Sequence, residues 1–169
     1  MGNQKTGGSV PTDTIVDAVL TASRVLVAVA ARSLGEVADE VTMTQYRSLV
    51  VLASRGPQSA AALAEAVDVT PPTATRMCDR LVRKGLVVRR HEQGDRRLIR
   101  LTLAKKGRDL VVSVIERRRI EIVRLLAAIP GEQQRALVDA LQHLTEAAGE
   151  VPEQDWSTGW DIEMGRVRR

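Results

Sequence analysis

Apolar residues recur at helical spacing over most of the chain. In residues 13–40 they lie almost all round a helical wheel, which predicts a long helix buried by more than one neighbour. Two more helices are predicted at about residues 104–128 and 132–148, separated by Pro130 and Gly131. In the helix at about residues 104–128, one stripe runs through Val111, Ile115, Arg118, Ile122, Leu125 and Ile129. In the helix at 132–148, the apolar face carries Leu137, Leu141, Leu144 and Ala148.

A shorter helix with a clear start signal lies between these long ones. Residues 42–45 read T-x-x-Q, which is a capping box, and Val41 and Tyr46 occupy the two positions of a hydrophobic staple. The helix is therefore expected to begin near Met43, and Gly-Pro at residues 56–57 should end it.

Two further caps follow at close spacing. Ser59 is placed to cap a short helix, and Thr70 to cap a second one that has Pro71 at its first position and ends at Gly85. A three-residue turn, residues 68–70, joins the two helices. This arrangement is typical of a helix-turn-helix.

A β-hairpin is predicted directly after the second helix. Residues 85–90 are rich in β-branched side chains, and residues 94–97, Gly-Asp-Arg-Arg, form the tip. In the returning strand one side carries Ile99, Leu101 and Leu103, and the other carries Arg100 and Thr102. The fold class is therefore mainly α, a winged helix-turn-helix with a small β-hairpin wing and long N- and C-terminal helices.

Composition narrows the class of protein. The chain has 169 residues and no Phe, so its core must be aliphatic. A single cysteine, Cys78, excludes an internal disulfide and fits a reducing, cytoplasmic compartment. Residues 1–12 are polar and are expected to be a disordered tail, and residues 149–169 form a C-terminal tail without a clear period. No apolar run free of charge is long enough to span a membrane, so no membrane association is expected.

Positive charge is concentrated in the middle of the chain. Residues 55–109 contain 13 Lys and Arg against 6 Asp and Glu, whereas the whole chain has a net charge of only +4. Such asymmetry is expected when one segment faces phosphates.

The helix that starts after Thr70 is two-sided. One side gathers Ala74, Met77, Cys78, Leu81 and Val82, and the other gathers Pro72, Thr75, Arg76, Asp79, Arg80 and Arg83. A short, polar, cationic face of this kind suits the major groove of DNA, although a merely solvated amphipathic helix has the same pattern. Asp79 is placed to pair with Arg76 or Arg83.

Three stretches, "VTMTQY", "SAAALAEAVDVTPPTATRMCDRLVRKGLVVRR" and "GDRRLIRLTLAKKG", together resemble the MarR family of winged-helix transcriptional regulators. The resemblance extends over residues 13–148 in element order and is sharpest over residues 42–107. One departure concerns the end of the wing, where the family has Leu-Thr three residues before a glycine. Here the pair is Leu103-Ala104, so the cap of the next helix is expected to shift to Thr102.

The resemblance implies that residues 13–148 form a DNA-binding and dimerisation domain, with a DNA-binding lobe at about residues 42–107. It implies that Arg97 enters the minor groove, that Asp95 braces the wing, and that Arg96 and Arg100 face phosphates. The DNA-contacting residues expected from the helix-turn-helix are Ser59, Thr70, Pro72, Thr73, Thr75, Arg76, Arg80 and Arg83.

The resemblance also implies a homodimer with interleaved terminal helices, a near-palindromic operator, and a repressor that responds to a small aromatic or amphiphilic anion. Tyr46 and Arg47 lie at the edge of the lobe and are candidates to bind such a ligand. The favoured alternative is that Tyr46 is a core residue that staples the start of its helix.

Other candidate residues favour structural roles. Cys78 lies on the packing side of its helix, and His91 and His143 have no companion cysteine, so neither a metal site nor a cofactor is expected. The run at residues 116–121, "ERRRIE", is either a solvated face or a dimer-interface ion-pair network. No phosphate loop or activated nucleophile supports an enzyme. A winged-helix module that binds an acidic protein partner remains the alternative to a DNA-binding regulator.

Overall fold

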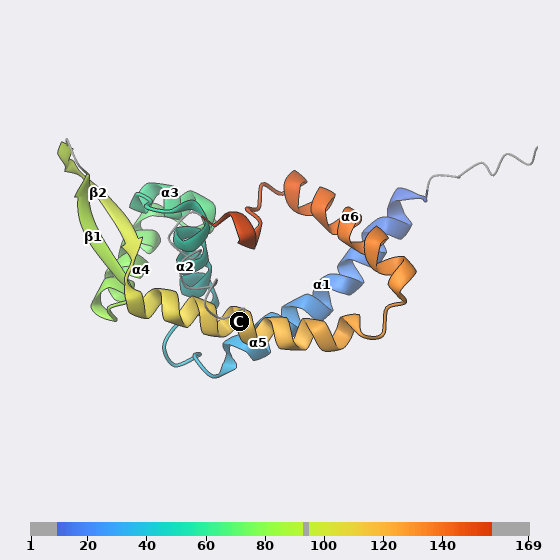
Figure 1. Ribbon diagram of the computed structural model, residues 1–169. Helices are drawn as coiled ribbons and strands as arrows, with labels where there is room; N and C mark the ends of the chain where they lie inside the picture. Colours follow the sequence, from blue (N-terminus) through green and yellow to red (C-terminus); the bar gives the residue numbers. More distant parts are fainter. Residues whose placement is uncertain (1–9, 93–94, 157–169) are drawn as a thin grey trace, which may run out of the picture.

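A computed structural model describes residues 10–92 and 95–156, and the side chains of these residues except 92 and 95–97. The elements are α1 (Thr12–Gly35), α2 (Met43–Arg55), α3 (Ala60–Ala66), α4 (Pro71–Arg83), β1 (Val87–Glu92), β2 (Asp95–Leu103), α5 (Lys105–Leu126), α6 (Gly131–Ala147) and a 3-10 turn η1 (Glu153–Asp155). Helices α2 to α4 and the hairpin form a lobe at one end, and α5 runs from this lobe to the far end (Figure 1). α1 packs along α5, and α6 leads back toward the lobe.

The lobe holds the hydrophobic core. Its fully buried large side chains come from α2 to α4 and from the base of the hairpin, and the start of α5 adds two more; they include Leu49, Leu52, Leu63, Leu81, Leu86, Val87, Val111 and Val114. The hairpin is antiparallel, with Val87 opposite Leu103 and Arg89 opposite Leu101. A bridge between Gln58 and Leu101 ties the hairpin to the segment before α3, since each backbone N–H donates to the other residue's carbonyl, over 3.1 and 2.8 Å.

Three of the predicted helix ends are confirmed. The Thr42 hydroxyl accepts from the Gln45 backbone N–H, and the Gln45 side chain accepts from the Thr42 N–H, which completes the capping box. Gly56 ends α2 with a φ of 74°, where glycine is favoured. The Ser59 hydroxyl caps α3 by accepting from Ala62 N–H at 3.1 Å.

The predictions that the side chains of Thr70 and Thr102 cap helices are wrong. Thr70 stands at the N-cap position of α4, but its hydroxyl is 2.9 Å from that of Thr73 and makes no cap bond. The cap of α5 is Ala104 rather than Thr102, whose hydroxyl is buried without a hydrogen-bond partner. Ala104 is held instead by its backbone N–H, which donates to the carbonyl of Leu86 at 3.0 Å.

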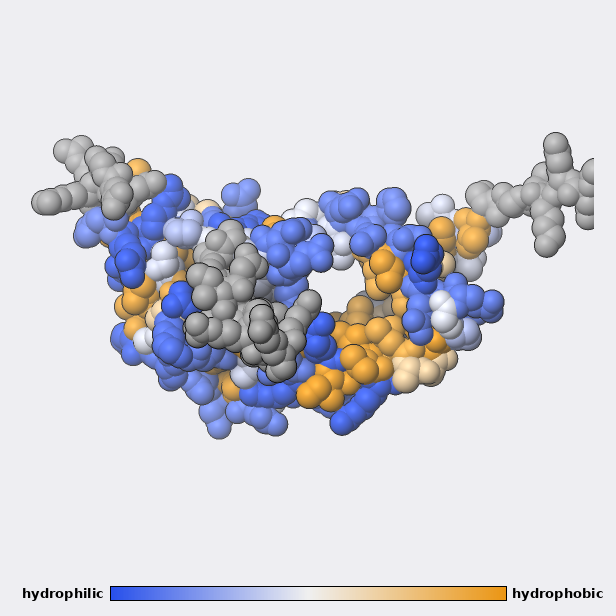
Figure 2. All heavy atoms as spheres, viewed as in Figure 1, coloured by the Kyte–Doolittle hydropathy of each residue, from blue (hydrophilic) through white to orange (hydrophobic). Residues whose placement is uncertain are grey.

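The predicted burial of residues 13–40 is wrong within a single chain. α1 ends at Gly35, and of its residues only Val29, Ser33 and Leu34 are buried. No residue of α6 is buried either. The apolar surface lies mostly at the end away from the lobe, over α1, α5 and α6 (Figure 2), and Ile99 on the hairpin is also exposed.

Helix α1 is longer than any charge-free apolar run within it, because Asp17 and Arg24 interrupt the run. By length and composition alone, α1 is long and apolar enough to cross a membrane. An apolar helix that is covered by another protein chain meets the same two criteria.

Candidate nucleic-acid interface and neighbouring cavity

The two-sided character of α4 is confirmed by burial. Ala74, Met77, Cys78 and Leu81 are buried against α2, α3 and the hairpin, and burial raises the pKa of the Cys78 thiol. The opposite face is exposed and presents Pro72, Thr73, Thr75, Arg76, Arg80 and Arg83. Packing of the apolar face therefore orients the polar face outward as one unit.

Backbone carbonyls of α4 hold two of its arginines. The Nε of Arg76 donates to the carbonyl of Pro72 at 3.3 Å, and the Nε of Arg83 donates to that of Asp79 at 3.4 Å. Each bond uses one of the five N–H donors of a guanidinium group.

The prediction that Asp79 pairs with Arg76 or Arg83 is wrong. Its carboxylate forms an ion pair with Arg89 on β1, not with Arg76 or Arg83. In the pairing of the hairpin, Arg89 shares a face with the buried residues Val87 and Leu101, and this face packs against α4. Side chains alternate between the two faces of a strand, so Arg89 lies on the same face as Val87, two residues before it. This alternation was the sequence signal that could have identified Arg89 as a contact between the hairpin and α4.

The tip of the hairpin lies partly outside the described residues. The backbone of β2 begins at Asp95, which pairs with Glu92 after an irregularity in register next to His91. The side chains of Asp95, Arg96 and Arg97 are outside the described part, so their roles stay predictions. Arg100 is half-buried and lies opposite Arg90 across the hairpin. Ser59 and Thr70 stand at the N-terminal ends of α3 and α4.

A cavity of about 460 Å³ lies between α2, α5 and the segment after α6. This segment, residues 150–156, includes η1 and is called the C-terminal strap below. The cavity is lined by Tyr46, Arg47 and Val50 of α2, by residues of α5 that include Ile115, Arg118, Arg119 and Ile122, and by Glu150, Glu153 and Trp156 of the strap. Both candidate ligand-binding residues, Tyr46 and Arg47, therefore meet at one cavity.

Tyr46 is a core residue that also lines the cavity. Its side chain belongs to the core and only 3% of the residue is exposed. Its hydroxyl is buried without a hydrogen-bond partner, and this burial raises the pKa of Tyr46 to about 12, against the opposing effect of Arg118. The guanidinium of Arg118 lies 6.0 Å from the centre of the Tyr46 ring, and its Nε is also buried without a partner.

The run at residues 116–121 is more than a solvated face. Arg117 donates to the carbonyl of Ser33 at 3.2 Å and pairs with Glu36, while Glu121 pairs with Arg32 at 2.6 Å. These contacts join α5 to α1 and to the turn after it, within one chain. The solvated-face prediction is therefore wrong for these residues.

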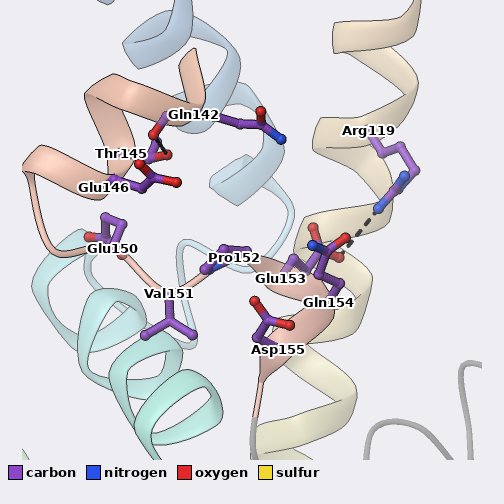
Figure 3. Close-up of a pocket in the computed structure, with 10 residues that line it drawn as sticks. All are labelled: Arg119, Gln142, Thr145, Glu146, Glu150, Val151, Pro152, Glu153, Gln154 and Asp155. Carbon is purple, nitrogen blue, oxygen red and sulfur yellow. Dashed lines mark hydrogen bonds and ion pairs between the residues drawn. The ribbon is translucent and has the colours of Figure 1, made fainter. Parts of the chain in front are cut away.

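The C-terminal strap carries carboxylates to the cavity arginines. Glu150 forms an ion pair with Arg47, and Glu153 pairs with Arg119 at 3.4 Å. Figure 3 shows Arg119 reaching from α5 to Glu153 beside a second hollow of about 750 Å³ between the strap and α6. Within residues 10–92 and 95–156, no three His, Cys, Asp or Glu side chains are grouped to hold a metal ion.

Comparison with known proteins agrees with this architecture. The MarR family model matches residues 41–99. The HTH-type transcriptional repressor MdtR of Bacillus subtilis is 30% identical over 119 residues, which are 70% of this chain and 77% of MdtR.

Solved structures extend the comparison beyond the lobe. RV1404 from Mycobacterium tuberculosis superposes with a TM-score of 0.77 at 41% identity, over 86% of this chain and 99% of that one. NadR in complex with 4-hydroxyphenylacetate superposes with a TM-score of 0.58 at 25% identity, over 85% and 97% of the two chains. The chain therefore belongs to the MarR family of winged-helix transcriptional regulators.

Proposed function

We propose that this regulator binds a specific double-stranded DNA operator as a homodimer in the cytoplasm, with α4 in the major groove and the hairpin in the minor groove, and that it has no catalytic role. The observation that carries the proposal is the exposed cationic face of α4, held outward by a buried opposite face. A helix that presents short polar and arginine side chains can reach base edges there.

The proposed DNA contacts divide into two sets. From the helix-turn-helix, Ser59, Thr70, Pro72, Thr73, Thr75, Arg76, Arg80 and Arg83 meet bases and adjoining phosphates. From the wing, Arg97 enters the minor groove, Arg96 and Arg100 face phosphates, and Asp95 braces the tip. The packing of β1 against α4 supports this division, because it sets the position of the wing relative to the helix, and the ion pair between Asp79 and Arg89 adds a contact between the two.

A homodimer is supported by the apolar surface that one chain leaves uncovered. α1, the distal half of α5 and α6 expose large apolar residues, among them Leu20, Leu26, Val123, Leu141 and Leu144. The space-filling view also has an opening between α6 and α5 (Figure 2), and we expect helices of a second copy to fill it. Two α4 helices would then read half-sites roughly 10 base pairs apart in a near-palindrome.

Ligand response is supported by the cavity. It has two aromatic walls, Tyr46 and Trp156, and three arginines at its lining. A small aromatic or amphiphilic anion matches this chemistry, and NadR, a relative of similar fold, was solved with 4-hydroxyphenylacetate. Repression would be relieved if the anion binds best to a conformation in which the two α4 helices no longer match the groove spacing.

The experiment is a salt titration of operator affinity for the wild type, Arg76→Ala and Arg97→Ala, with Arg135→Ala on α6 as a control that also removes one charge. Arg76→Ala should cost about 1–3 kcal/mol and relax the preference at particular base pairs. Arg97→Ala should weaken binding to many sequences, reduce the salt slope by about one unit, and lessen the preference for A·T-rich flanks.

Equal slopes and equal flank preference for the wild type and Arg97→Ala would contradict the role of the wing. Binding to an acidic protein partner that persists at high salt, together with no operator binding, would favour the interaction-module alternative instead.

A further inference from the structure

The C-terminal strap closes one side of the cavity beside Tyr46. It leaves α6, returns to the lobe, and places its last residues between α2 and α5 (Figure 1). Trp156 packs against the core, and its indole N–H donates to the carbonyl of Val151 at 3.0 Å. Glu150, Val151 and Trp156 are half-buried, whereas residues 152–155 are exposed, so the strap is docked at its two ends.

The strap supplies negative charge where the cavity is positive. Glu150 pairs with Arg47 on α2, and Glu153 pairs with Arg119 on α5. Glu153 is also close enough to Tyr46 to contribute to the rise in its pKa. Both ion pairs are partly open to solvent, with side-chain exposures of 40% and 39% for the first and 58% and 36% for the second. Ion pairs of this exposure are weak and exchange readily with other ions.

The cavity also offers recognition groups that the strap does not satisfy. The Tyr46 hydroxyl and the Nε of Arg118 are buried donors without a hydrogen-bond partner. The Tyr46 ring lines the cavity from α2, so its place does not depend on the strap. Buried, unpartnered donors beside an aromatic ring favour a planar aromatic ligand that bears an acceptor.

We propose that the C-terminal strap is an internal competitor of the anionic ligand: Glu150 and Glu153 occupy Arg47 and Arg119, and an aromatic carboxylate binds by displacing them. The inference rests on the proposed ligand response of this cavity. The apparent affinity for the ligand is the intrinsic affinity multiplied by the fraction of molecules with the strap undocked. The strap therefore sets the ligand concentration at which the regulator responds.

The test uses the full chain with Trp160→Phe, so that Trp156 is the one fluorescent tryptophan. Benzoate and 4-hydroxyphenylacetate, with their neutral amides as controls, are titrated against this protein and against the double variant Glu150→Gln/Glu153→Gln. Trp156 fluorescence and calorimetry report binding. A second double variant, Asp139→Asn/Glu146→Gln, removes the same charge from exposed residues of α6, outside both the strap and the cavity.

We expect the Glu150→Gln/Glu153→Gln variant to bind the carboxylates about three- to tenfold more tightly, because both competing charges are gone. The amides and the control variant should show no gain. In the protein that keeps both glutamates, adding a carboxylate should also lower the hydrogen-exchange protection of residues 151–156.

Equal carboxylate affinity in both proteins would overturn the competition while leaving the ligand site intact. Weaker binding by the Glu150→Gln/Glu153→Gln variant would overturn it as well, since the strap would then assist the ligand. No binding by either protein would overturn both the competition and the ligand response. The salt titration of DNA binding tests the DNA-binding part of the proposed function independently of all these results.

Discussion

Tyr46 illustrates how burial changes the chemistry of a single residue. Its ring completes the staple at the start of α2, and its hydroxyl is carried into the core without a partner. Removal of water from the phenolate raises the pKa from 10.0 to about 12, and the positive charge of Arg118 offsets only part of that effect. The residue is therefore a neutral hydrogen-bond donor throughout the physiological pH range.

This shift predicts alkaline destabilisation that depends on Tyr46. The folded protein keeps the phenolic proton above the pH at which the unfolded chain loses it. The stability contributed by this proton is thus fully present below about pH 10 and is lost as the pH rises toward 12, by about 2–3 kcal/mol. Urea unfolding of the wild type and Tyr46→Phe at several pH values between 7 and 11.5 measures the difference.

In Tyr46→Phe this part of the alkaline loss should disappear. At pH 7 the variant should differ from the wild type by less than about 1 kcal/mol, because the hydroxyl it removes has no hydrogen-bond partner. The same alkaline loss in both proteins would show that the Tyr46 phenol is solvated.

At the scale of elements, the start of α5 decides how the hairpin sits on the lobe. The backbone of Ala104 is bonded to Leu86, and α5 passes so close that a Cβ on Gly107 would lie 2.1 Å from the Leu86 carbonyl oxygen. A backbone carbonyl cannot turn aside as a flexible side chain can. The close approach of α5 to the base of β1 therefore requires glycine at this position.

Gly107→Ala should destabilise the protein by about 1–3 kcal/mol or more, because α5 must move away from Leu86 to relieve the overlap. Gly35→Ala at the end of α1 is the matched control, since an added Cβ there meets nothing within 4 Å. That control should be neutral or stabilising by up to about 1 kcal/mol, as expected for Gly to Ala in a helix. Equal denaturation midpoints for the two variants would contradict the required close approach.

For the whole molecule, the apolar surface on α1, α5 and α6 is the feature on which the proposed dimer rests. One chain leaves large aliphatic residues exposed along three helices, and these residues come together at the end opposite the DNA-binding lobe (Figure 2). Exposed apolar surface of this extent marks a contact with another surface. A second copy of the chain places two cationic α4 faces on one molecule, which the proposed operator reading requires.

Leu144→Asp on α6 should convert the dimer to a monomer in sedimentation, because a carboxylate would be buried in the apolar contact. Operator affinity should fall by about 100-fold, since the two half-sites would no longer be bound as a unit. Gln133→Asp on the same helix is the control and should remain dimeric. A monomeric wild type, or one that partitions into phospholipid vesicles through α1, would contradict the dimer.

The sequence by itself determined the features that depend on neighbouring residues. The capping box at Thr42, the cap at Ser59, the end of α2 at Gly56 and the two faces of α4 were all predictable. Each is decided by side chains a few residues apart, whose spacing is set by helix geometry. The order of the helices and the hairpin follows from the same local signals.

Tertiary structure alone decided the contacts between distant segments. The choice of Arg89 as the partner of Asp79, the shift of the α5 cap from Thr102 to Ala104, and the docking of the C-terminal strap on Arg47 and Arg119 have no local cause. Several charged residues compete for each partner, and local spacing by itself does not rank them. Only the packed core, by setting which elements lie side by side, selects the pairs that form.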